Sequence, residues 1–364
     1  MDILLISHDF SVTGAPNSLL RQAKYFRDAG HNVDVWSLDD GGLKQRYIEA
    51  GFNPIIVENS YGQIRRLYKR TNKKYDFIIC NTTVTYKAVS VLQKYKTPLV
   101  WFIRETKLVD DGMRNEPKFA KVFKNFYNIY TVSEYAANVI KKYNKHVRVI
   151  NNAIADNFTK PKKTSKKIVF GYIGSIIPIK GVDLLLDAFE KLITKNKNIS
   201  LNIAGKAPAE MQNTHNSAGI NWLGEVQLNE KQNFFDAIDV LVVPSIDDPC
   251  PLTVIEGAMY GKPIITTDTV GSNYMVQNGK NGFIVKTGDV NDLYKCMKHI
   301  LSCDLDNMKQ ASRNMYLLYG TTERERKQVL KMLDDNLNKL PIIKTKRWYN
   351  FFVPKSDYID LHEC

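Results

Sequence analysis

The chain has 364 residues, of which 44% are hydrophobic, and it carries a formal net charge of +13 at pH 7. This length suffices for two domains with cores of their own, and without an apolar run of about 18 residues we expect no membrane-spanning segment. The five cysteines are odd in number and scattered, without CxxC or zinc-ligand spacing, so we expect a reducing, cytoplasmic environment and no metal site.

Positive charge is concentrated in the first part of the chain. Residues 1–160 hold 25 Lys and Arg against 15 Asp and Glu, which accounts for +10 of the total of +13. Such a field attracts nucleic acid, an anionic membrane surface or an anionic substrate, and a solvated lysine-rich surface is the alternative. Because no nucleic-acid-binding motif accompanies the charge, we expect no nucleic-acid partner.

Residues 1–157 alternate between short apolar runs and helical patterns, beginning with the run DILLIS and a helix opened by Pro16. The N-terminal residues lack a basic n-region and a small-residue cleavage site, so we expect no signal peptide. Strands separated by helices predict a parallel sheet with helices on both faces. The expected strands are residues 2–7, 33–37, 53–57, 77–80, 99–103, 129–132 and 147–150.

Two basic segments in this part are candidates for contact with an anionic membrane surface. One runs from Arg65 to Lys74, and the other is a helical pattern in which Lys118, Lys121 and Lys124 alternate with phenylalanines. The alternative for the second segment is a helix that buries its phenylalanine face against the sheet.

Residues 158–167 are polar and rich in lysine without an apolar period, so we expect them to link two domains. A second alternating series covers residues 168–330, and residues 331–364 hold a C-terminal helix and a basic, aromatic tail. The lone D-x-D pattern, at Asp304 and Asp306, is interpreted as a helix cap. The expected strands of the second series are residues 168–173, 199–204, 220–223, 240–244, 263–267 and 283–285.

The most informative stretch begins with an apolar run that ends at Pro244 and continues through a polar loop to Pro251. The run predicts a buried strand, and Pro251 stands where the first turn of a helix tolerates proline. Such a junction points free N–H groups and the positive end of a helix dipole out of the carboxyl edge of a sheet, where anionic ligands bind. Asp248 and Glu256, eight residues apart, are placed to face one ligand from two sides.

This spacing resembles the donor-site signature of the retaining GT-B glycosyltransferases of family 4. In that signature an acidic residue, seven others and a glutamate precede a segment of the type E-A-M-A-x-G-x-P-V. Here Asp248, seven residues and Glu256 are followed by residues 257–263, GAMYGKP. The resemblance implies the α/β GT-B fold, in which two Rossmann-like, doubly wound domains face each other across a cleft. It also implies retention at the anomeric carbon and independence from a divalent metal or any other cofactor.

By this resemblance, the second domain holds the nucleotide-sugar donor. Residues 171–181, GYIGSIIPIKG, resemble the family segment G-R-L-x-x-x-K-G, whose arginine and lysine hold the donor diphosphate. Gly174 lets a ligand approach the backbone, and Lys180 is implied to meet phosphate oxygens, with a solvated lysine as the alternative. Ser175 stands where the family usually has arginine, and Lys206 is the candidate substitute for that cation.

The resemblance also assigns the two carboxylates. Glu256 is implied to accept both ribose hydroxyls of the nucleotide, and with Asp248 and Lys180 it forms the candidate catalytic set. The alternatives are a partly exposed helix glutamate for Glu256 and a helix N-cap for Asp248. Backbone amides at the helix start are expected to meet the departing phosphate or the sugar hydroxyls; the residues there are Pro251, which cannot donate, Leu252 and Thr253.

In the first domain, the pattern S-H-D…G-A-P over residues 7–16 resembles the opening of many polysaccharide-building members. Gly14 is expected to permit close approach of the donor across the cleft. His8 is either an acceptor-side group or a plain loop histidine. Arg104 stands where relatives commonly have histidine before a glutamate, here Glu105. We take His8, Arg104 and Glu105 as acceptor-side candidates.

The resemblance therefore implies a retaining glycosyltransferase that moves a sugar from a nucleotide-sugar to a cell-surface polysaccharide or a lipid-linked oligosaccharide. We expect it in the cytoplasm, peripheral at the inner face of the plasma membrane. Two alternatives remain open, a catalytically weak GT-B partner subunit or sugar-binding module and a nucleotide-sugar epimerase. The absence of GxGxxG after the first strand, of Walker A and of G-x-S-x-G argues against a dehydrogenase, a P-loop NTPase and an α/β-hydrolase.

Overall fold

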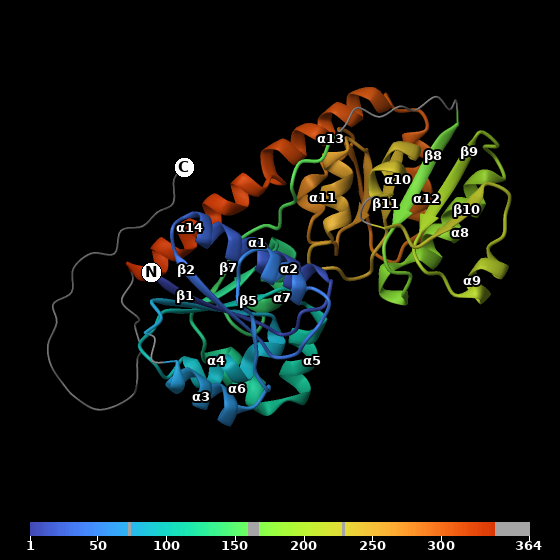
Figure 1. Cartoon of the computed structure of the whole chain (residues 1–364). Helices are drawn as coiled ribbons and strands as arrows, with labels where there is room; N and C mark the ends of the chain where they lie inside the picture. Colours follow the sequence, from blue (N-terminus) through green and yellow to red (C-terminus); the bar gives the residue numbers. More distant parts are fainter. Residues whose placement is uncertain (72–73, 159–166, 228–229, 339–364) are drawn as a thin grey trace, which may run out of the picture.

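The described residues form two parallel sheets, each flanked by helices, so the expected α/β fold with two doubly wound sheets is confirmed (Figure 1). Most of the expected linker and the whole of the basic, aromatic tail lie outside the described residues. The computed structural model describes four stretches of the chain, which are residues 1–71, 74–158, 167–227 and 230–338.

The first sheet has the strand order β3-β2-β1-β4-β5-β6-β7, and all of its neighbouring strands are parallel. The order reverses direction between β1 and β4, which makes the carboxyl edge there a topological switch point. Strand β3 is shorter than expected because only two of its residues pair with β2. The strands are β1 (Asp2–Ser7), β2 (Asn32–Ser37), β3 (Ile55–Ile56), β4 (Phe77–Asn81), β5 (Leu99–Ile103), β6 (Ile129–Thr131) and β7 (Val147–Val149).

Three helices of the first half of the chain (residues 1–158) begin at residues with clear local causes. Ser133 and Ser60 accept N–H bonds at the starts of α7 and α3, and Pro117 opens α6. The helices are α1 (Gly14–Asp28), α2 (Lys44–Glu49), α3 (Tyr61–Arg70), η1 (Thr83–Thr85), α4 (Tyr86–Leu92), α5 (Lys107–Asn115), α6 (Pro117–Asn125) and α7 (Glu134–Lys141).

The second sheet has the order β10-β9-β8-β11-β12-β13, again with parallel pairs. Its order reverses between β8 and β11, so the loops after these two strands share a second switch point. The strands are β8 (Ile168–Ile173), β9 (Ile199–Ala204), β10 (Ile220–Gly224), β11 (Val240–Val243), β12 (Ile264–Thr267) and β13 (Gly282–Val285).

Helices of the second half cover this sheet and then return to the first half. Asp304 caps α13 through the N–H groups of Asp306 and Asn307, so the interpretation of the D-x-D pattern as a cap is confirmed. The helices are η2 (Pro178–Lys180), α8 (Val182–Ile193), α9 (Ala209–Thr214), α10 (Lys231–Ala237), α11 (Leu252–Met259), η4 (Asn273–Met275), α12 (Val290–Ile300), α13 (Leu305–Tyr319) and α14 (Thr322–Leu337).

The strands are apolar on both sides because both faces of each sheet are covered. In β1, Ile3 and Leu5 join one hydrophobic cluster while Leu4 and Ile6 join another. The first of these clusters continues from the first sheet to α11 and α14, so the two halves share buried apolar contacts. A third cluster fills the face of the second sheet that packs against α8 and α12.

The phenylalanine face of α6 belongs to the core. Phe119 and Phe123 are 3% and 0% exposed and pack against Trp101 of β5. The alternative in which this helix buries its phenylalanines against the sheet is therefore confirmed, and insertion of that face into a membrane is wrong. In the part of the chain that the structure describes, each helix is too short or too polar to cross a bilayer.

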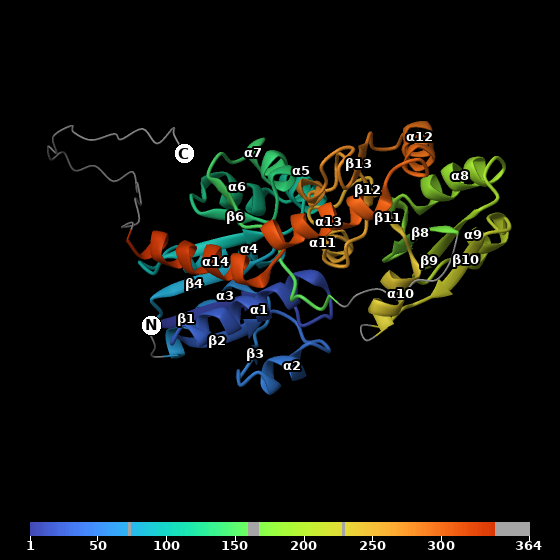
Figure 2. The same cartoon turned by 90° about the horizontal axis from the view of Figure 1, so that it is seen from above.

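Helix α14 lies along the first half and contacts α1 (Figures 1 and 2). The boundary that we placed at residue 330 falls inside this helix. Its Glu325 side chain is only 1% exposed and accepts hydrogen bonds from Arg21 Nε at 2.5 Å, Arg21 Nη2 at 2.9 Å and the Tyr25 hydroxyl at 2.9 Å. A buried carboxylate with three donors fixes the position of α14 on α1.

We predict that Glu325→Gln lowers the free energy of unfolding by about 3 kcal/mol, because Arg21 would stay buried without its counter-charge. Urea unfolding monitored by circular dichroism measures this. The matched control is Glu323→Gln on the same helix, whose carboxylate is 59% exposed and lies 3.6 Å from Lys327. That change should cost less than about 1 kcal/mol, and equal losses for both variants would contradict the prediction.

Candidate functional site

A cavity of about 890 Å³ lies between the carboxyl edges of the two sheets and is lined by residues of both halves. The first half contributes the loop after β1 and the start of α1, and the second half contributes the loops after β8, β9 and β10 and the start of α11. Both switch points therefore open toward one space. The predicted residues that line it are Gly14, Gly174, Ser175, Lys206, Leu252, Thr253 and Glu256.

The remaining predicted residues lie outside the cavity lining. Pro251 directly precedes α11, so it is the residue before the helix and not part of its first turn as expected. The others are Lys180 and Asp248 in the second half and His8, Arg104 and Glu105 in the first half.

The backbone forms one wall of the cavity at two adjoining glycines. A Cβ at Gly205 would lie 2.2 Å from the carbonyl oxygen of Gly174, so any side chain there would separate the loops after β8 and β9. Across the cavity, a Cβ at Gly14 would meet no protein atom within 4 Å. The backbone of the cavity wall is thus closely packed at Gly205, whereas the space beside Gly14 is open.

Glu256 lies in the second turn of α11 with a side chain that is 13% exposed. Its Oε1 accepts from Lys231 Nζ at 2.6 Å, whereas its buried Oε2 has no hydrogen-bond partner. Lys231, at the start of α10, also lines the cavity. A largely buried carboxylate with one unsatisfied oxygen is suited to accept hydroxyl groups of a ligand.

Lys180 and Asp248 form an ion pair of 2.5 Å between Nζ and Oδ2, with side chains 27% and 10% exposed. Burial raises the pKa of Asp248, and the Lys180 ammonium opposes that shift. The alternative reading of Asp248 as a helix cap is wrong, because α11 begins only after Pro251 and no side chain caps it. The alternative of a solvated Lys180 is wrong as well, because its ammonium group is paired with Asp248.

The position of Lys180 depends on the next residue. Gly181 has φ of +64°, and a Cβ there would lie 2.3 Å from the carbonyl oxygen of Pro244. Only glycine allows η2 to pack this closely on the end of β11. The amide of Ile246 also donates to the carbonyl oxygen of Ile179 at 2.8 Å, which holds the two loops together.

Cationic side chains line the cavity alongside the carboxylates Glu225 and Glu256. Ser175 and Lys206 are both exposed and line the cavity, so Lys206 is near enough to face the same ligand. Arg46 lines it from the first half and was not predicted. These cations make the mouth of the cavity suitable for an anionic ligand.

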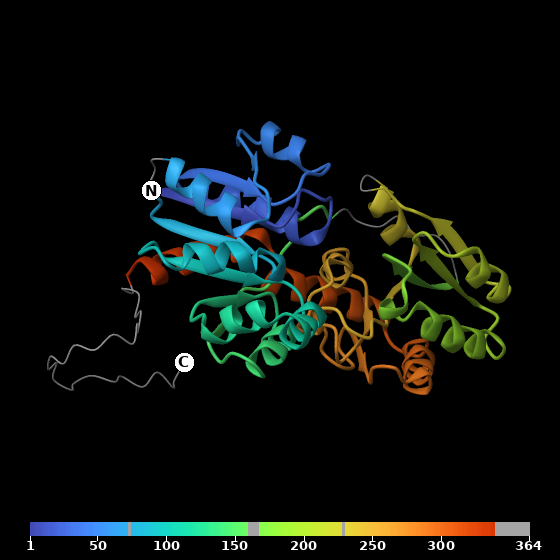
Figure 3. The same cartoon turned by 90° about the horizontal axis from the view of Figure 1, so that it is seen from below.

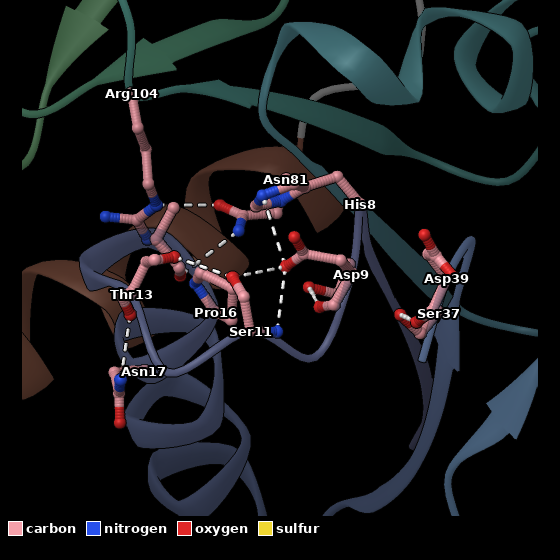
Figure 4. Close-up of polar contacts among 12 residues, drawn as sticks. His8, Asp9, Ser11, Thr13, Pro16, Asn17, Ser37, Asp39, Asn81 and Arg104 are labelled. Atoms are coloured by element: carbon pink, nitrogen blue, oxygen red, sulfur yellow. Dashed lines mark hydrogen bonds and ion pairs between the residues drawn. The ribbon is translucent and has the colours of Figure 1, made fainter. Parts of the chain in front are cut away.

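The Asp9 side chain stabilises the loop after β1 through hydrogen bonds (Figure 4). Its Oδ1 accepts from the Ser11 amide at 3.1 Å and from the Ser11 hydroxyl at 2.9 Å. His8 lies beside Asp9, with Nε2 at 3.3 Å from Oδ1 and a buried Nδ1 without a partner. Burial lowers the pKa of His8, so its imidazole is neutral near pH 7.

Arg104 is held in the first half by two amide oxygens. Its Nε donates to Asn81 at 2.7 Å (Figure 4). Its Nη1 donates to Asn152 at 3.0 Å, and its Nη2 is buried without a partner. Asn81 also donates to the carbonyl oxygen of Ala15, which ties β4 and β5 to the start of α1. Burial lowers the pKa of Arg104 to about 10, which still leaves the side chain charged at neutral pH.

Glu105 follows Arg104 and accepts from the backbone amides of Thr83 at 3.2 Å and Arg104 at 3.0 Å. Burial raises its pKa to about 7, although these amides and the Arg104 charge oppose the shift. The carboxyl group therefore exchanges between its neutral and charged forms near physiological pH.

Sequence reasoning missed the partners of the predicted side chains. Lys231 pairs with Glu256 from 25 positions away, and no local pattern indicates that contact. Asp247 directly precedes Asp248 in the loop between β11 and α11, residues 244–251, which we call the acidic loop. It accepts hydrogen bonds from the first half, and only its place in this loop could have suggested them. The described residues with metal-ligand spacing, Asp187, Glu190 and His215, lie apart from the cavity lining.

Two family models match the chain in succession. The model described as glycosyl-transferase family 4 matches residues 1–154, and the model described as glycosyl transferases group 1 matches residues 153–316.

Curated relatives are similar over part of their length. An uncharacterised glycosyltransferase of Methanocaldococcus jannaschii is 31% identical over 125 residues, which cover 34% of this chain and 35% of that protein. The capsular polysaccharide biosynthesis glycosyltransferase CapM of Staphylococcus aureus is 27% identical, with 38% and 37% covered. The lipopolysaccharide core biosynthesis glycosyltransferase LpsE of Rhizobium meliloti is 24% identical, with 50% and 56% covered. The chain thus matches about a third to a half of the length of these relatives.

Solved structures are similar over nearly the whole chain. Anabaena HepE in complex with UDP has a TM-score of 0.79 at 18% identity, with 92% of this chain and 100% of that chain covered. The lipopolysaccharide outer core galactosyltransferase WaaB has a TM-score of 0.76 at 15% identity, with 92% and 99% covered. At these identities the likeness establishes the GT-B fold alone. The family matches over residues 1–316 show that the chain belongs to the group 1, family 4 glycosyltransferases.

Proposed function

We propose that the chain transfers a sugar from a nucleotide-sugar donor to a cell-surface polysaccharide or lipid-linked oligosaccharide, with retention at the anomeric carbon. The observation that most directly supports this proposal is the cavity of about 890 Å³, where Glu256 and the start of α11 face the first half. CapM and LpsE are named for capsular polysaccharide and lipopolysaccharide core biosynthesis, which supports this class of acceptor.

The nucleotide would bind in the second half. The free Oε2 of Glu256 accepts one ribose hydroxyl, and Oε1 becomes available for the other when Lys231 turns away. The similar HepE structures are described with UDP and with UDP-glucose, which supports a nucleotide-sugar ligand. In this proposal Glu256 is the residue that recognises the nucleoside.

The departing diphosphate would meet positive charge and free N–H groups. The amides of Leu252 and Thr253 are in the first turn of α11, where N–H groups lack partners within the helix. Lys206 faces the cavity, and Lys180 would divide its ammonium between Asp248 and phosphate. Fixed charges that meet the negative charge as the glycosidic bond breaks lower the barrier, so we propose that no divalent metal is required.

The acceptor would bind on the first half. The neutral imidazole of His8 can accept a hydrogen bond from a sugar hydroxyl, and the charged Arg104 and the titrating Glu105 lie at the end of β5. Enclosure between the two halves would limit hydrolysis of the donor by water.

We place the protein in the cytoplasm, at the inner face of the plasma membrane. Helices α3 and α6 both pack against α4, and the Lys118 ammonium lies 6.0 Å from the centre of the Tyr61 ring, so the two basic helices lie on the same face of the first sheet. Since the phenylalanines of α6 are buried, contact with an anionic leaflet would be electrostatic and therefore sensitive to salt.

We predict that one nucleotide base raises the melting temperature in a panel of UDP-, GDP-, dTDP- and CMP-sugars, and that the shift persists in EDTA. A ligand that binds only the folded chain stabilises it by about 2.7 kcal/mol at a concentration of 100 Kd. Differential scanning fluorimetry measures the shift, with the free sugars as controls. A shift that disappears in EDTA would contradict metal independence, and no shift with any donor would contradict the donor site.

Turnover then separates the remaining alternatives. Incubation of the stabilising donor with membrane lipid extract should yield a glycosylated product, detected by mass spectrometry. Binding without turnover would favour the partner subunit or binding module, and isomerised donor without transfer would favour an epimerase.

We predict that Glu256→Ala lowers donor affinity and transfer by at least about 100-fold, because both ribose hydroxyls would lose their acceptor. Isothermal titration with the nucleoside diphosphate and steady-state kinetics measure the two effects. The control is Glu210→Ala on α9, an exposed residue outside the cavity lining. If Glu256→Ala folds and keeps its affinity, the assignment of Glu256 is wrong.

A further inference from the structure

The acidic loop after β11 is bound to the first half through Asp247. Its Oδ1 accepts from the Thr106 hydroxyl at 2.8 Å and from the Tyr135 hydroxyl at 2.9 Å, and its Oδ2 lies 2.9 Å from the same Thr106 oxygen. Thr106 precedes α5 and Tyr135 is in the first turn of α7. One carboxylate of the second half is therefore shared by two elements of the first half.

A second contact two residues further along closes the same junction. The Ser133 hydroxyl donates to the carbonyl oxygen of Pro249 at 2.6 Å and accepts from the Ala136 amide at 3.1 Å, so it caps α7 and holds the loop at once. A Cβ at Gly271 would lie 1.8 Å from the Pro249 oxygen and 2.3 Å from Ser133 Oγ. The junction is thus packed closely enough to require glycine beside it.

The views from above and below show this junction from opposite sides. In both, the loops that follow β11 and β12 lie beside the segment around α5 and α7 of the first half (Figures 2 and 3). The contact therefore lies between the two halves.

The anion of Asp247 is held by hydroxyl groups. Among the ion pairs of the described residues there is none that involves Asp247. Burial, followed by the bond to Asp247, raises the pKa of Tyr135, so Tyr135 keeps its proton and remains a donor at physiological pH. Hydrogen bonds are directional, and the two hydroxyl groups have fixed positions on the first half. They therefore fix the position of the Asp247 carboxylate.

The neighbouring carboxylate faces the other way. Asp248 pairs with Lys180 of the second half, and its amide and carbonyl bond to Thr269 and Gly271. Adjacent peptide units therefore connect the first half to the Lys180–Asp248 pair. A displacement of Asp247 would be transmitted to Asp248 through a single peptide bond, which is planar and rigid.

We propose that Asp247 is a positioning residue: the first half holds it through Thr106 and Tyr135, and this holds Asp248 and Lys180 in the arrangement that the transfer step requires. The inference rests on the proposed function for its kinetic consequence. It goes beyond the proposed function because it holds that Thr106 and Tyr135, two side chains of the acceptor-side half, align the acidic loop of the other half. Nucleotide recognition stays with Glu256 on α11, outside this contact.

We predict that Asp247→Ala lowers kcat by at least about tenfold, whereas KM for the donor and the affinity for the nucleoside diphosphate change by a clearly smaller factor of about threefold, because Lys180 is displaced but Glu256 and the amides of α11 still hold the nucleotide. Asp247→Asn keeps an acceptor oxygen and should recover part of kcat. Thr106→Val and Tyr135→Phe should each lower kcat by a smaller factor, and neither should add to the effect of Asp247→Ala, because all three remove the same contact. Steady-state kinetics and isothermal titration measure these quantities.

The matched control is Asp304→Ala, which removes the cap of α13 and leaves the junction intact. If Asp304→Ala loses as much stability as Asp247→Ala but keeps its kcat, the loss of kcat in Asp247→Ala comes from positioning and not from general destabilisation. Unchanged kcat in Asp247→Ala would overturn the inference, and so would a proportional loss of nucleotide affinity.

Hydrogen exchange distinguishes failure of this inference from failure of the proposed function. In Asp247→Ala the backbone amides of residues 246, 247, 248 and 250 should exchange at least about tenfold faster than in the unaltered chain, whether or not a transfer reaction is found. If the unaltered chain transfers no sugar, the proposed function fails, and the exchange rates still decide whether Asp247 holds the loop. Unchanged exchange in this segment would overturn its role.

Discussion

The site depends on two separate sheets holding their carboxyl edges opposite each other. Apolar contacts continue from α1 to α11 and α14, and the buried Glu325 carboxylate sets where α14 lies on the first half. Burial of apolar surface supplies most of the free energy that holds the two halves together, but it is not directional. The Glu325 carboxylate accepts hydrogen bonds from Arg21 and Tyr25, so it has one favourable position. Because the cavity is lined from both halves, its shape follows from this arrangement.

Both carboxylates of the family signature are paired with lysines in the described structure. Glu256 lies 2.6 Å from Lys231, and Asp248 lies 2.5 Å from Lys180. The pairing offsets the cost of burying each carboxylate, and it makes the lysines competitors of any ligand hydroxyl or phosphate that binds there. In the proposed reaction, donor binding would exchange these ion pairs for contacts with ribose and diphosphate.

The acidic loop carries two adjacent aspartates that serve opposite sides. Asp247 bonds to hydroxyls of the first half, and Asp248 bonds to Lys180 of the second. The loop is consequently part of the interface between the halves as well as part of the second half's own site. This arrangement explains why the sheet edge that holds the acceptor-side candidates Arg104 and Glu105 also contacts the loop, since Thr106 follows them directly.

The sequence by itself determined the architecture, because strands buried on both faces must be apolar throughout and the helices between them must be amphipathic. It also determined that Gly174 and Asp248 lie at one edge of the second sheet, since each is in a loop that follows a strand and the carboxyl ends of parallel strands share an edge. Only the tertiary structure decided which side chains meet. Asp247 contacts partners 112 and 141 positions away, and Lys231 contacts Glu256 from 25 positions away. Local patterns encode which face of an element is buried, but contacts between polar side chains depend on how the two sheets pack, and that is fixed by the sum of many weak, non-directional contacts across the whole chain.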